Sequence, residues 1–346
     1  MPHTLDLIVQ PRLSPGGSLA ADQALLGEVR ANAASRAGAL RIYDLAGEVL
    51  SLGRYHLAPD GPPGGAGVQV WRRRSGGRAM PWGDGFVGLS LVLPHRSALF
   101  APEPLTLSPE QVLNRHVRGI LEACELSGVA AFYPGRDVVT VDGRLLALVS
   151  FEVDATGALL VEAVIAGTRD MSILPALLDR ADPGGVVKAR MLTPDDTTSL
   201  ARVLGRELGT GEVAERLRRG YERRLGVRFE ERVMTADASF DERGWLRARR
   251  PRTDLDRHAS AAIQLGVLEM HFARDGGRLR EVVLAGDFIA NSPAIERLER
   301  ELRGCPAERA AIEGVVTRVL AEPGSFVLGL GRPEAVAEAI VQGLTA

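Results

Sequence analysis

A basic stretch that contains two glycines follows a predicted strand, Val68 to Trp71. It reads Arg-Arg-Arg-Ser-Gly-Gly-Arg-Ala from Arg72 to Ala79. Paired glycines such as Gly76 and Gly77 let backbone N–H groups approach a ligand closely, and arginines can hold a carboxylate or a phosphate bidentately. The stretch predicts an anion-binding loop, with Arg54 after the neighbouring strand as a second contact. A solvated basic turn would have the same composition.

A second candidate contact is an aspartate that follows an arginine and precedes another predicted strand. Asp137 stands directly before Val138 to Val141, and Asp142-Gly143 then leads into Arg144 to Phe151. This is the pattern of a β-hairpin with an Asp-Gly turn. An aspartate at its start can receive the ribose or adenine group of a nucleotide, whereas Asp-Gly hairpins are also common as purely structural units.

Lysine is nearly absent from the chain. Of the 42 basic residues only Lys188 is a lysine. A GC-rich coding sequence explains such a bias without any functional cause. Chemistry that depends on a lysine must nevertheless use Lys188 or be absent, and the alternative for Lys188 is an ordinary surface residue.

The elements that position these residues alternate between strands and helices. A capping box at Ser108 and Gln111 starts a predicted helix that ends before Gly128 and carries Cys124 on its buried stripe, where we expect a structural role. Further helices are expected at 18–30, 172–180, 196–223, 293–303, 307–320 and 333–344. Strands are expected at 4–9, 39–43, 49–52, 68–71, 87–94, 138–141, 144–151, 157–166, 266–273 and 278–284. The polar, arginine-rich residues 234–257 are the best linker candidate, so the order predicts a strand-rich α/β part followed by a small α+β part.

Composition excludes several other classes. The net charge is −2 and aromatic residues make up 5%, which argues against a nucleic-acid partner. No apolar run reaches membrane-spanning length, the N-terminus lacks the features of a signal peptide, and two cysteines cannot form a disulfide framework. We therefore expect a cytoplasmic protein with no membrane partner. The six histidines have no ligand spacing along the sequence, which predicts no protein metal site.

Taken together, these motifs resemble lipoate–protein ligases of the biotin/lipoyl ligase superfamily, over nearly the whole chain. The segments that carry the resemblance are Ser18–Asp22, Leu52–Arg54, Arg73–Ala79, Gly135–Arg144, Gly286–Phe288 and Leu298–Cys305. The resemblance implies a mixed-sheet catalytic domain over residues 1–240, a linker at 241–257 and an accessory α+β domain at 258–346. It also implies ATP with Mg²⁺ and lipoate or octanoate as small molecules. The implied macromolecular partner is a lipoyl-domain protein or another lipoate acceptor, whose lysine receives the acyl group.

The same resemblance assigns roles to individual residues. Arg54, Arg73, Gly76, Gly77 and Asp137 would contact the nucleotide and the acyl group, and Lys188 would contact phosphate. Trp82 and Leu145 would line the acyl slot.

The sequence departs from the family pattern at critical positions. Leu145 stands where the family has its essential lysine, Arg78 replaces the third glycine of the loop, and Trp82 to Phe86 replaces a His-Asp-x-Gly-Asn segment. Arg78 can supply a positive charge but cannot donate or accept the proton as lysine does. Two hypotheses follow: an enzyme that activates and transfers a lipoyl group with Arg78 and Lys188 as its cations, or a non-catalytic member that binds a lipoyl group or a lipoylated protein.

Overall fold

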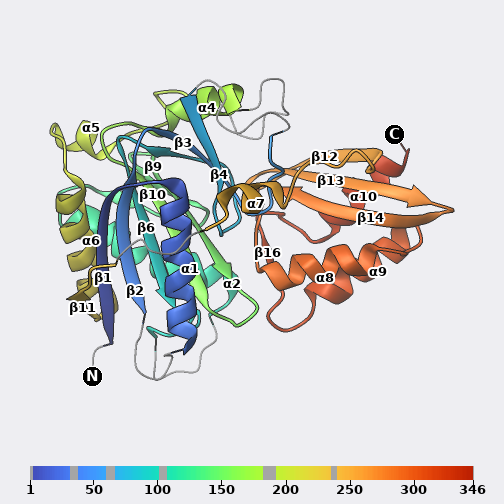
Figure 1. Cartoon of the computed structure of the whole chain (residues 1–346), viewed down its shortest axis with the longest axis horizontal. Coiled ribbons are helices and arrows are strands. Elements are labelled where there is room, and N and C mark those ends of the chain that lie inside the picture. Colours follow the sequence, from blue (N-terminus) through green and yellow to red (C-terminus); the bar gives the residue numbers. More distant parts are fainter. Residues whose placement is uncertain are drawn as a thin grey trace.

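The computed structural model describes residues 3–31, 38–59, 67–100, 107–181, 192–234 and 240–345. It has a large lobe built on a mixed eight-stranded sheet and a smaller lobe formed by the last part of the chain (Figure 1). This is the two-part mixed α/β architecture that the sequence predicts. Within the described residues no helix is both long and apolar enough to cross a membrane.

The eight-stranded sheet has the order β11-β1-β2-β6-β10-β9-β8-β7. Its strands are β1 (Thr4–Leu13), β2 (Ala39–Leu45), β6 (Phe86–Leu93), β7 (Ala131–Phe132), β8 (Val138–Val141), β9 (Arg144–Val153), β10 (Leu159–Ala166) and β11 (Arg228–Glu231). The β11, β1 and β2 strands are parallel, and from β2 to β7 each neighbour is antiparallel. The predicted hairpin is confirmed as β8 and β9, with Asp142 and Gly143 at φ +50° and +77° in its turn.

A three-stranded sheet beside the large one carries the glycine-rich loop. Its order is β4 (Val68–Arg72), β3 (Glu48–Leu52) and β5 (Met80–Gly83), with β4 parallel and β5 antiparallel to β3. The loop runs from the end of β4 to the start of β5. Both ends of the loop are therefore fixed by hydrogen bonds to the same central strand.

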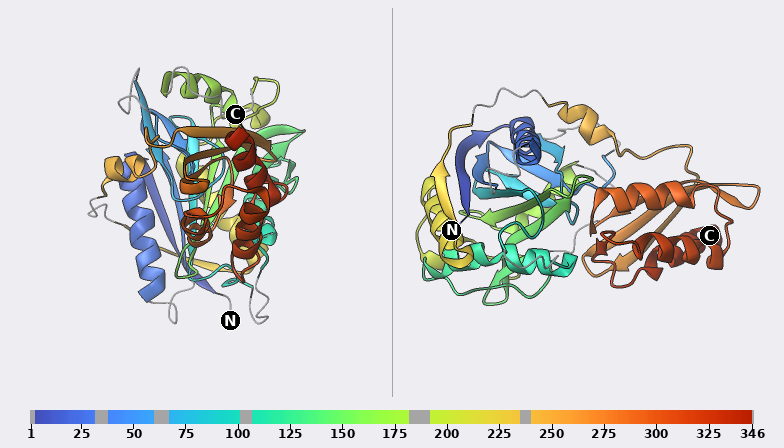
Figure 2. Two further views of the ribbon diagram at one scale, coloured as in Figure 1. Left: turned by 90° about the vertical axis from the view of Figure 1, so that its right-hand side faces the viewer. Right: turned by 90° about the horizontal axis from the view of Figure 1, so that it is seen from below.

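Helices cover both faces of the large sheet (Figure 2). The long helix α1 (Pro15–Ala31) lies on one face, and α2 (Pro109–His116), α3 (Arg118–Glu125) and α6 (Thr210–Leu225) lie on the other. The single helix predicted after Ser108 is divided into two helices at Val117. At this junction the Ile120 N–H donates to the carbonyl oxygen of Val117, three residues earlier, at 2.9 Å. The helix predicted at 196–223 is α5 (Leu200–Leu204) followed by α6. The predicted helix 172–180 is the 3-10 turn η2 (Met171–Ile173) followed by α4 (Leu174–Ala181).

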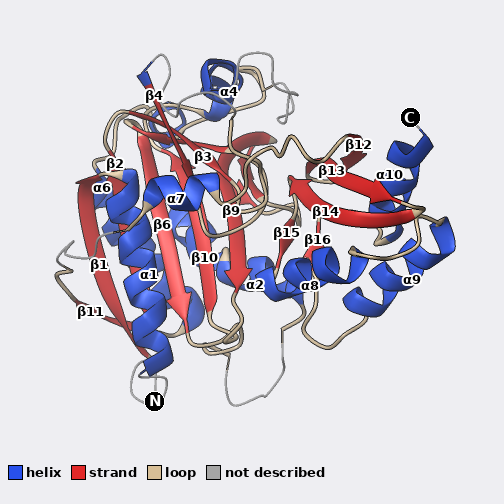
Figure 3. Ribbon diagram, turned by 45° about the vertical axis from the view of Figure 1, so that its right-hand side comes forward, coloured by secondary structure: helices blue, strands red, loops and turns tan. Residues whose placement is uncertain are grey.

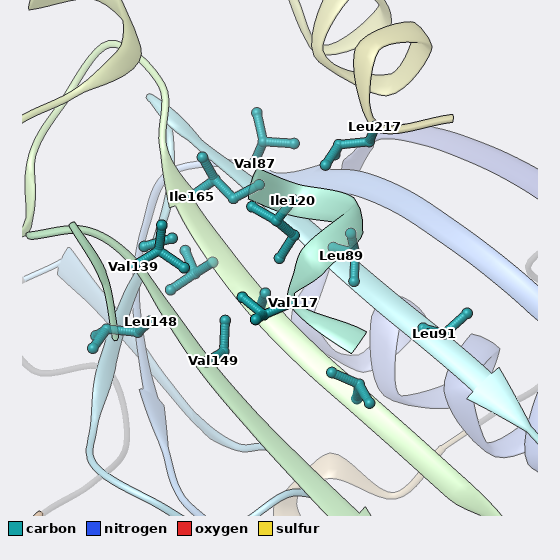
Figure 4. Packing of buried hydrophobic residues seen from close by; sticks show 14 of the residues in the cluster. Val87, Leu89, Leu91, Val117, Ile120, Val139, Leu148, Val149, Ile165 and Leu217 are labelled. Atoms are coloured by element: carbon teal, nitrogen blue, oxygen red, sulfur yellow. The ribbon is translucent and has the colours of Figure 1, made fainter. Parts of the chain in front are cut away.

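The main core lies between the sheet and the helices α2, α3 and α6. Figure 4 shows Val87, Leu89 and Leu91 of β6 and Ile165 of β10 in one cluster with Val117, which lies between α2 and α3, Ile120 of α3 and Leu217 of α6. Cys124 is buried in the same cluster, and burial raises the pKa of its thiol to about 12. That placement fits the structural role expected for this cysteine.

The smaller lobe is one antiparallel sheet covered on one face by helices (Figure 3). The sheet has the order β12 (Arg257–Ile263), β13 (Gly266–Asp275) and β14 (Arg278–Gly286), and the helices are α8 (Ser292–Leu302), α9 (Arg309–Leu320) and α10 (Glu334–Thr345). It has its own apolar core, with Phe272, Leu298 and Ile340 among its buried members. The segment predicted as the linker contains a short helix, α7 (Glu242–Arg247).

The two lobes are joined by buried contacts next to the glycine-rich loop. Tyr55 of the large lobe stacks on Phe288 at 4.6 Å between ring centroids. The His56 Nε2 lies 2.9 Å from the Asp287 Oδ1, and its Nδ1 accepts from the Gly53 N–H, so Nε2 carries the donated proton. Beyond Phe288 the chain forms β15 (Ile289–Ala290), which pairs with β16 (Val327–Leu328).

Candidate functional site

The glycine-rich loop is shaped from inside by Arg73. This side chain is fully buried, and its guanidinium donates to the carbonyl oxygens of Gly76, Arg78 (2.7 Å) and Ser51 (3.4 Å) and to the Ser75 hydroxyl (3.1 Å). Burial lowers the pKa of Arg73 to about 10, although nearby carboxylates oppose this effect. In this structure Arg73 holds the loop through its backbone carbonyls.

The two glycines permit the close backbone approach that the sequence predicts, and here the approaching group belongs to the smaller lobe. The Gly77 N–H donates to the Phe288 oxygen at 2.6 Å, and Gly77 has a φ of +79°. A Cβ on Gly76 would lie 2.4 Å from the same oxygen. From the other side, the Ser150 hydroxyl donates to the Gly76 oxygen at 2.8 Å. The junction between the lobes thus occupies the outer edge of the loop.

Arg78 and Asp137 form a bidentate ion pair. The Arg78 Nε lies 2.6 Å from Asp137 Oδ2, and its second nitrogen lies 2.6 Å from Oδ1. The Arg78 side chain is 18% exposed and the Asp137 side chain 2%. Burial lowers the pKa of Arg78, but the charge and hydrogen bonds of Asp137 outweigh it, so the net direction is upward and the guanidinium stays charged. The pair joins the loop to the start of β8, so these two predicted site residues do meet.

Leu145 and Trp82, predicted to line an acyl slot, both belong to the main apolar core. Leu145 is 7% exposed, and its N–H and carbonyl pair with the main chain of Asp196 and Thr198. Trp82 stacks on Tyr43 at 5.3 Å and meets the edge of Trp71 at 5.7 Å. Both side chains are therefore packed against protein, and β9 carries no cation at position 145.

Beneath the loop lies a buried polar cluster that the motif analysis did not single out. Arg41 and Asp22 form a fully buried ion pair at 2.8 Å, and the Glu162 carboxylate accepts from the Ser75 N–H at 2.7 Å. Burial, reinforced by the negative charge of Asp22, raises the pKa of Glu162. The available signal was one charged residue inside an otherwise apolar strand, as in Leu-Leu-Val-Glu-Ala-Val from Leu159 to Val164.

A cleft of about 270 Å³ opens between the two lobes beside this loop. Glu152 at its floor accepts from the Ser292 N–H (3.0 Å) and hydroxyl (2.5 Å), and burial raises the pKa of Glu152 to about 7. The guanidinium groups of Arg54 and Arg74 lie 5.2 and 5.5 Å from the Trp245 ring. The cleft is lined by Leu26, Arg30, Arg54, Arg74, Glu152, Asp154, Ala155, Thr156, Ala158, Leu160, Ser292, Pro293 and Glu296. Three arginines and three carboxylates line it, Arg30 is paired with Asp154, and Arg54 reaches it while its backbone N–H bonds the Ser75 oxygen at 2.8 Å.

The structure thus brings Arg54, Arg73, Gly76, Gly77, Arg78 and Asp137 around one loop. Lys188, the predicted phosphate contact, lies outside the described residues. A different group of possible ligands, His258, Glu269 and His271, comes together on the smaller lobe, and the sequence analysis missed it. His258 precedes Glu269 by 11 residues and His271 by 13, and it meets them because β12 pairs with β13.

Comparison with known proteins identifies a family for this chain. Residues 15–222 match the lipoyl protein ligase A/B catalytic domain, and residues 253–323 match the bacterial lipoate protein ligase C-terminus. No curated protein sequence matches the chain.

Solved structures share the fold at low sequence identity. LipL1 of P. falciparum in complex with lipoate is 13% identical with a TM-score of 0.71, over 98% of this chain and 99% of that chain. The bi-partite lipoate protein ligase of Thermoplasma acidophilum, studied with its E2 lipoyl domain, is 15% identical with a TM-score of 0.54, over 72% and 99%. A lipoate-protein ligase A bound with ATP is 16% identical with a TM-score of 0.51, over 72% and 94%. The match to the catalytic-domain model spans most of the chain, and the chain therefore belongs to the lipoyl protein ligase A/B family, as a divergent member with leucine at position 145.

Proposed function

We propose that this chain activates lipoate, or a related acyl group such as octanoate, with ATP and Mg²⁺ and transfers it to a lysine of a lipoyl domain. In that reaction the acyl carboxylate attacks the α-phosphorus of ATP and pyrophosphate leaves. The acceptor amine then attacks the acyl carbonyl, and AMP leaves. Proteins of the same fold support this choice of substrates and partner: one is in complex with lipoate, one is bound with ATP, and one was studied with its E2 lipoyl domain.

The observation that carries the proposal is the placement of Arg78. Position 145, after the hairpin turn, holds a leucine, and Arg78 instead presents a charged guanidinium from the loop, held at two points by Asp137. A fixed cation of this kind stabilises negative charge that develops on phosphate or carbonyl oxygens. Because arginine does not exchange protons at neutral pH, Arg78 acts through charge alone, and the acceptor amine must lose its proton to another group.

A second function is favoured by a different observation. The Gly77 N–H is already bonded to Phe288, and Leu145 is packed in the core, so two contacts that an acyl-adenylate would use are occupied by protein. On this evidence the alternative is a non-catalytic member that binds a lipoyl group or a lipoylated protein.

Lipoate-dependent exchange of pyrophosphate into ATP separates the two functions. The proposal expects exchange by the wild-type chain and a loss of roughly 10²-fold in Arg78→Ala, the usual cost of one electrostatic stabiliser. Lys188→Ala should also reduce the exchange if that residue contacts phosphate. The matched control is Arg206→Ala, which removes an exposed arginine paired with Glu212 on the surface and should leave the rate unchanged.

Binding measured in parallel completes the test. Lipoate or octanoate that binds the folded chain raises its melting temperature. A clear shift without any exchange, in the wild type and in every variant, would favour the non-catalytic function. If millimolar ligand produces no shift in melting temperature and no exchange is detected, both functions are overturned.

A further inference from the structure

Three side chains with metal-binding atoms meet on the face of the small sheet that points away from its helices. His258 of β12 stands directly opposite His271 of β13, and Glu269 lies two residues before His271 on the same strand. Since side chains alternate between the two faces of a strand, all three share one face. The opposite face carries Ala259 and Phe272, which a Cβ on Gly343 of α10 would contact.

The distances within this group, the His258–Glu269–His271 cluster, are short. The two imidazole rings have their centroids 4.6 Å apart, and the His271 Nε2 lies 3.3 Å from a Glu269 carboxylate oxygen. One ligand atom from each residue can be chosen so that all three lie within 4.8 Å of one another. The strand backbones fix the Cβ positions, so the cluster is set by sheet register rather than by flexible loops.

Burial is graded across the cluster. Glu269 is 3% exposed, His271 is intermediate and His258 is exposed. A carboxylate therefore forms the floor and two imidazoles form the rim, which gives an ion direct access from solvent. A buried carboxylate also gains from a cation held beside it.

We propose that the His258–Glu269–His271 cluster is a binding site for a divalent transition metal, with Zn²⁺ as the ion that suits it. Two imidazoles and one carboxylate make a donor set typical of zinc sites that keep a fourth position open. Mg²⁺ and Ca²⁺ prefer all-oxygen ligands, so the imidazoles select against them. At Zn–N bonds of about 2.1 Å, tetrahedral ligands stand roughly 3.4 Å apart, and the 3.3 Å between the His271 Nε2 and the Glu269 carboxylate oxygen is close to that separation.

The site is separate from the acyl chemistry. Its residues belong to the smaller lobe, and its occupancy does not depend on whether the chain is a ligase. The proposal replaces the expectation of no protein metal site, which rested on spacing along the sequence alone. Spacing alone misses it because the ten residues between His258 and Glu269 include the turn that folds β13 back on β12.

The test is a calorimetric titration of the full-length, metal-stripped chain with Zn²⁺. One equivalent is expected to bind. His258→Ala and His271→Ala should each weaken the binding at least tenfold, and Glu269→Gln should do so without changing the size of the side chain. Co²⁺ supplies a second probe, because its visible absorption bands report coordination by few ligands that include nitrogen. These bands should disappear in the same variants.

The control variant is His95→Ala, which removes another exposed histidine from the large lobe and should keep the full stoichiometry. Circular dichroism spectra establish that each variant is folded. If Glu269→Gln fails to fold, the Zn²⁺ affinity of His258→Ala, a substitution at an exposed position, still tests the proposal. Binding that survives in the His258→Ala/His271→Ala double variant, or a wild-type chain that takes up no Zn²⁺ at 100-fold molar excess, would overturn the proposal.

Discussion

The carboxylate of Asp137 and the guanidinium of Arg78 face each other through two hydrogen bonds of 2.6 Å. Asp137 stands at the start of β8 and Arg78 at the end of the glycine-rich loop, so the pair ties together two segments that are 59 residues apart. A bidentate arginine–carboxylate pair fixes geometry as well as charge. The contact that would position a cation in the proposed reaction therefore also joins two parts of the fold.

Removing the cation should destabilise the protein. In Arg78→Met the Asp137 carboxylate stays buried without its partner, and we expect a loss of about 3 kcal/mol in the free energy of unfolding, measured with urea. Asp137→Asn in the Arg78→Met background should recover part of that loss, because it removes the isolated charge. Arg206→Met, at the exposed pair with Glu212, should be indistinguishable from wild type. A loss in Arg78→Met no larger than in Arg206→Met would show that the pair is structurally dispensable.

Glu152 should make stability depend on pH. Burial is the largest cause that raises its pKa, to about 7 from 4.5, while Arg54 and Ser292 oppose it. The folded state then binds more protons than the unfolded state between these two values. The contribution of Glu152 to the free energy of unfolding is fully present below pH 4.5, decreases as the pH rises, and is lost above pH 7. The free energy of unfolding then decreases by about 1.4 kcal/mol per pH unit at most. The decrease over the whole range is on the order of 3 kcal/mol.

Glu152→Gln isolates this contribution. The amide keeps an oxygen that can accept from Ser292 but cannot titrate. We expect the difference in unfolding free energy between wild type and Glu152→Gln to change in favour of the variant as the pH rises from 4.5 to 8. A difference that stays constant over this range would mean that Glu152 titrates normally in the folded protein.

The junction between the lobes depends on the small size of Gly76. An alanine Cβ there would lie 2.4 Å from the Phe288 oxygen, so Gly76→Ala must move the smaller lobe away from the loop. We expect a loss of roughly 1–3 kcal/mol, as for other overpacked sites, and faster proteolysis within residues 241–257. Gly27→Ala in α1 is the control, since its Cβ meets nothing within 4 Å. Equal protease resistance in the two variants would contradict a tight junction.

The sequence predicted the mixed α/β architecture and the hairpin because their signals are local. Asp142 and Gly143 adopt the positive φ values that the turn requires, and the helical spacing of apolar residues located α1. It also predicted which loop gathers the arginines. What local pattern could not supply was the partner of each group, since the approach of Phe288 to Gly77 joins residues more than 200 positions apart.

The buried charges illustrate the same limit. Arg73 was predicted as a ligand contact from its type and position, and its burial among the loop carbonyls follows only from the packing of β3 beside the loop. Likewise, His258 and His271 become neighbours through strand register, which depends on the length of the turn between them. Residue types indicated the available chemistry, and tertiary pairing decided which groups meet.

Leu145→Lys tests whether the scaffold still supports transfer. Leu145 is 7% exposed, and its side chain offers neither a charge nor a hydrogen bond at the position after the hairpin turn. A lysine there should raise lipoyl transfer to a lipoyl domain by about 10²-fold, measured by the mass of the acceptor. Burial of the new ammonium should at the same time lower the melting temperature. Leu145→Met, of similar length without charge, should keep the wild-type rate. Brisk transfer by the wild type would mean that the chain has a different catalytic solution from a lysine at position 145, and it would reject the non-catalytic alternative. If both forms bind lipoate and neither transfers it, then Arg78 and the segment from Trp82 to Phe86 have altered the site beyond rescue by one residue, and binding is the function that remains.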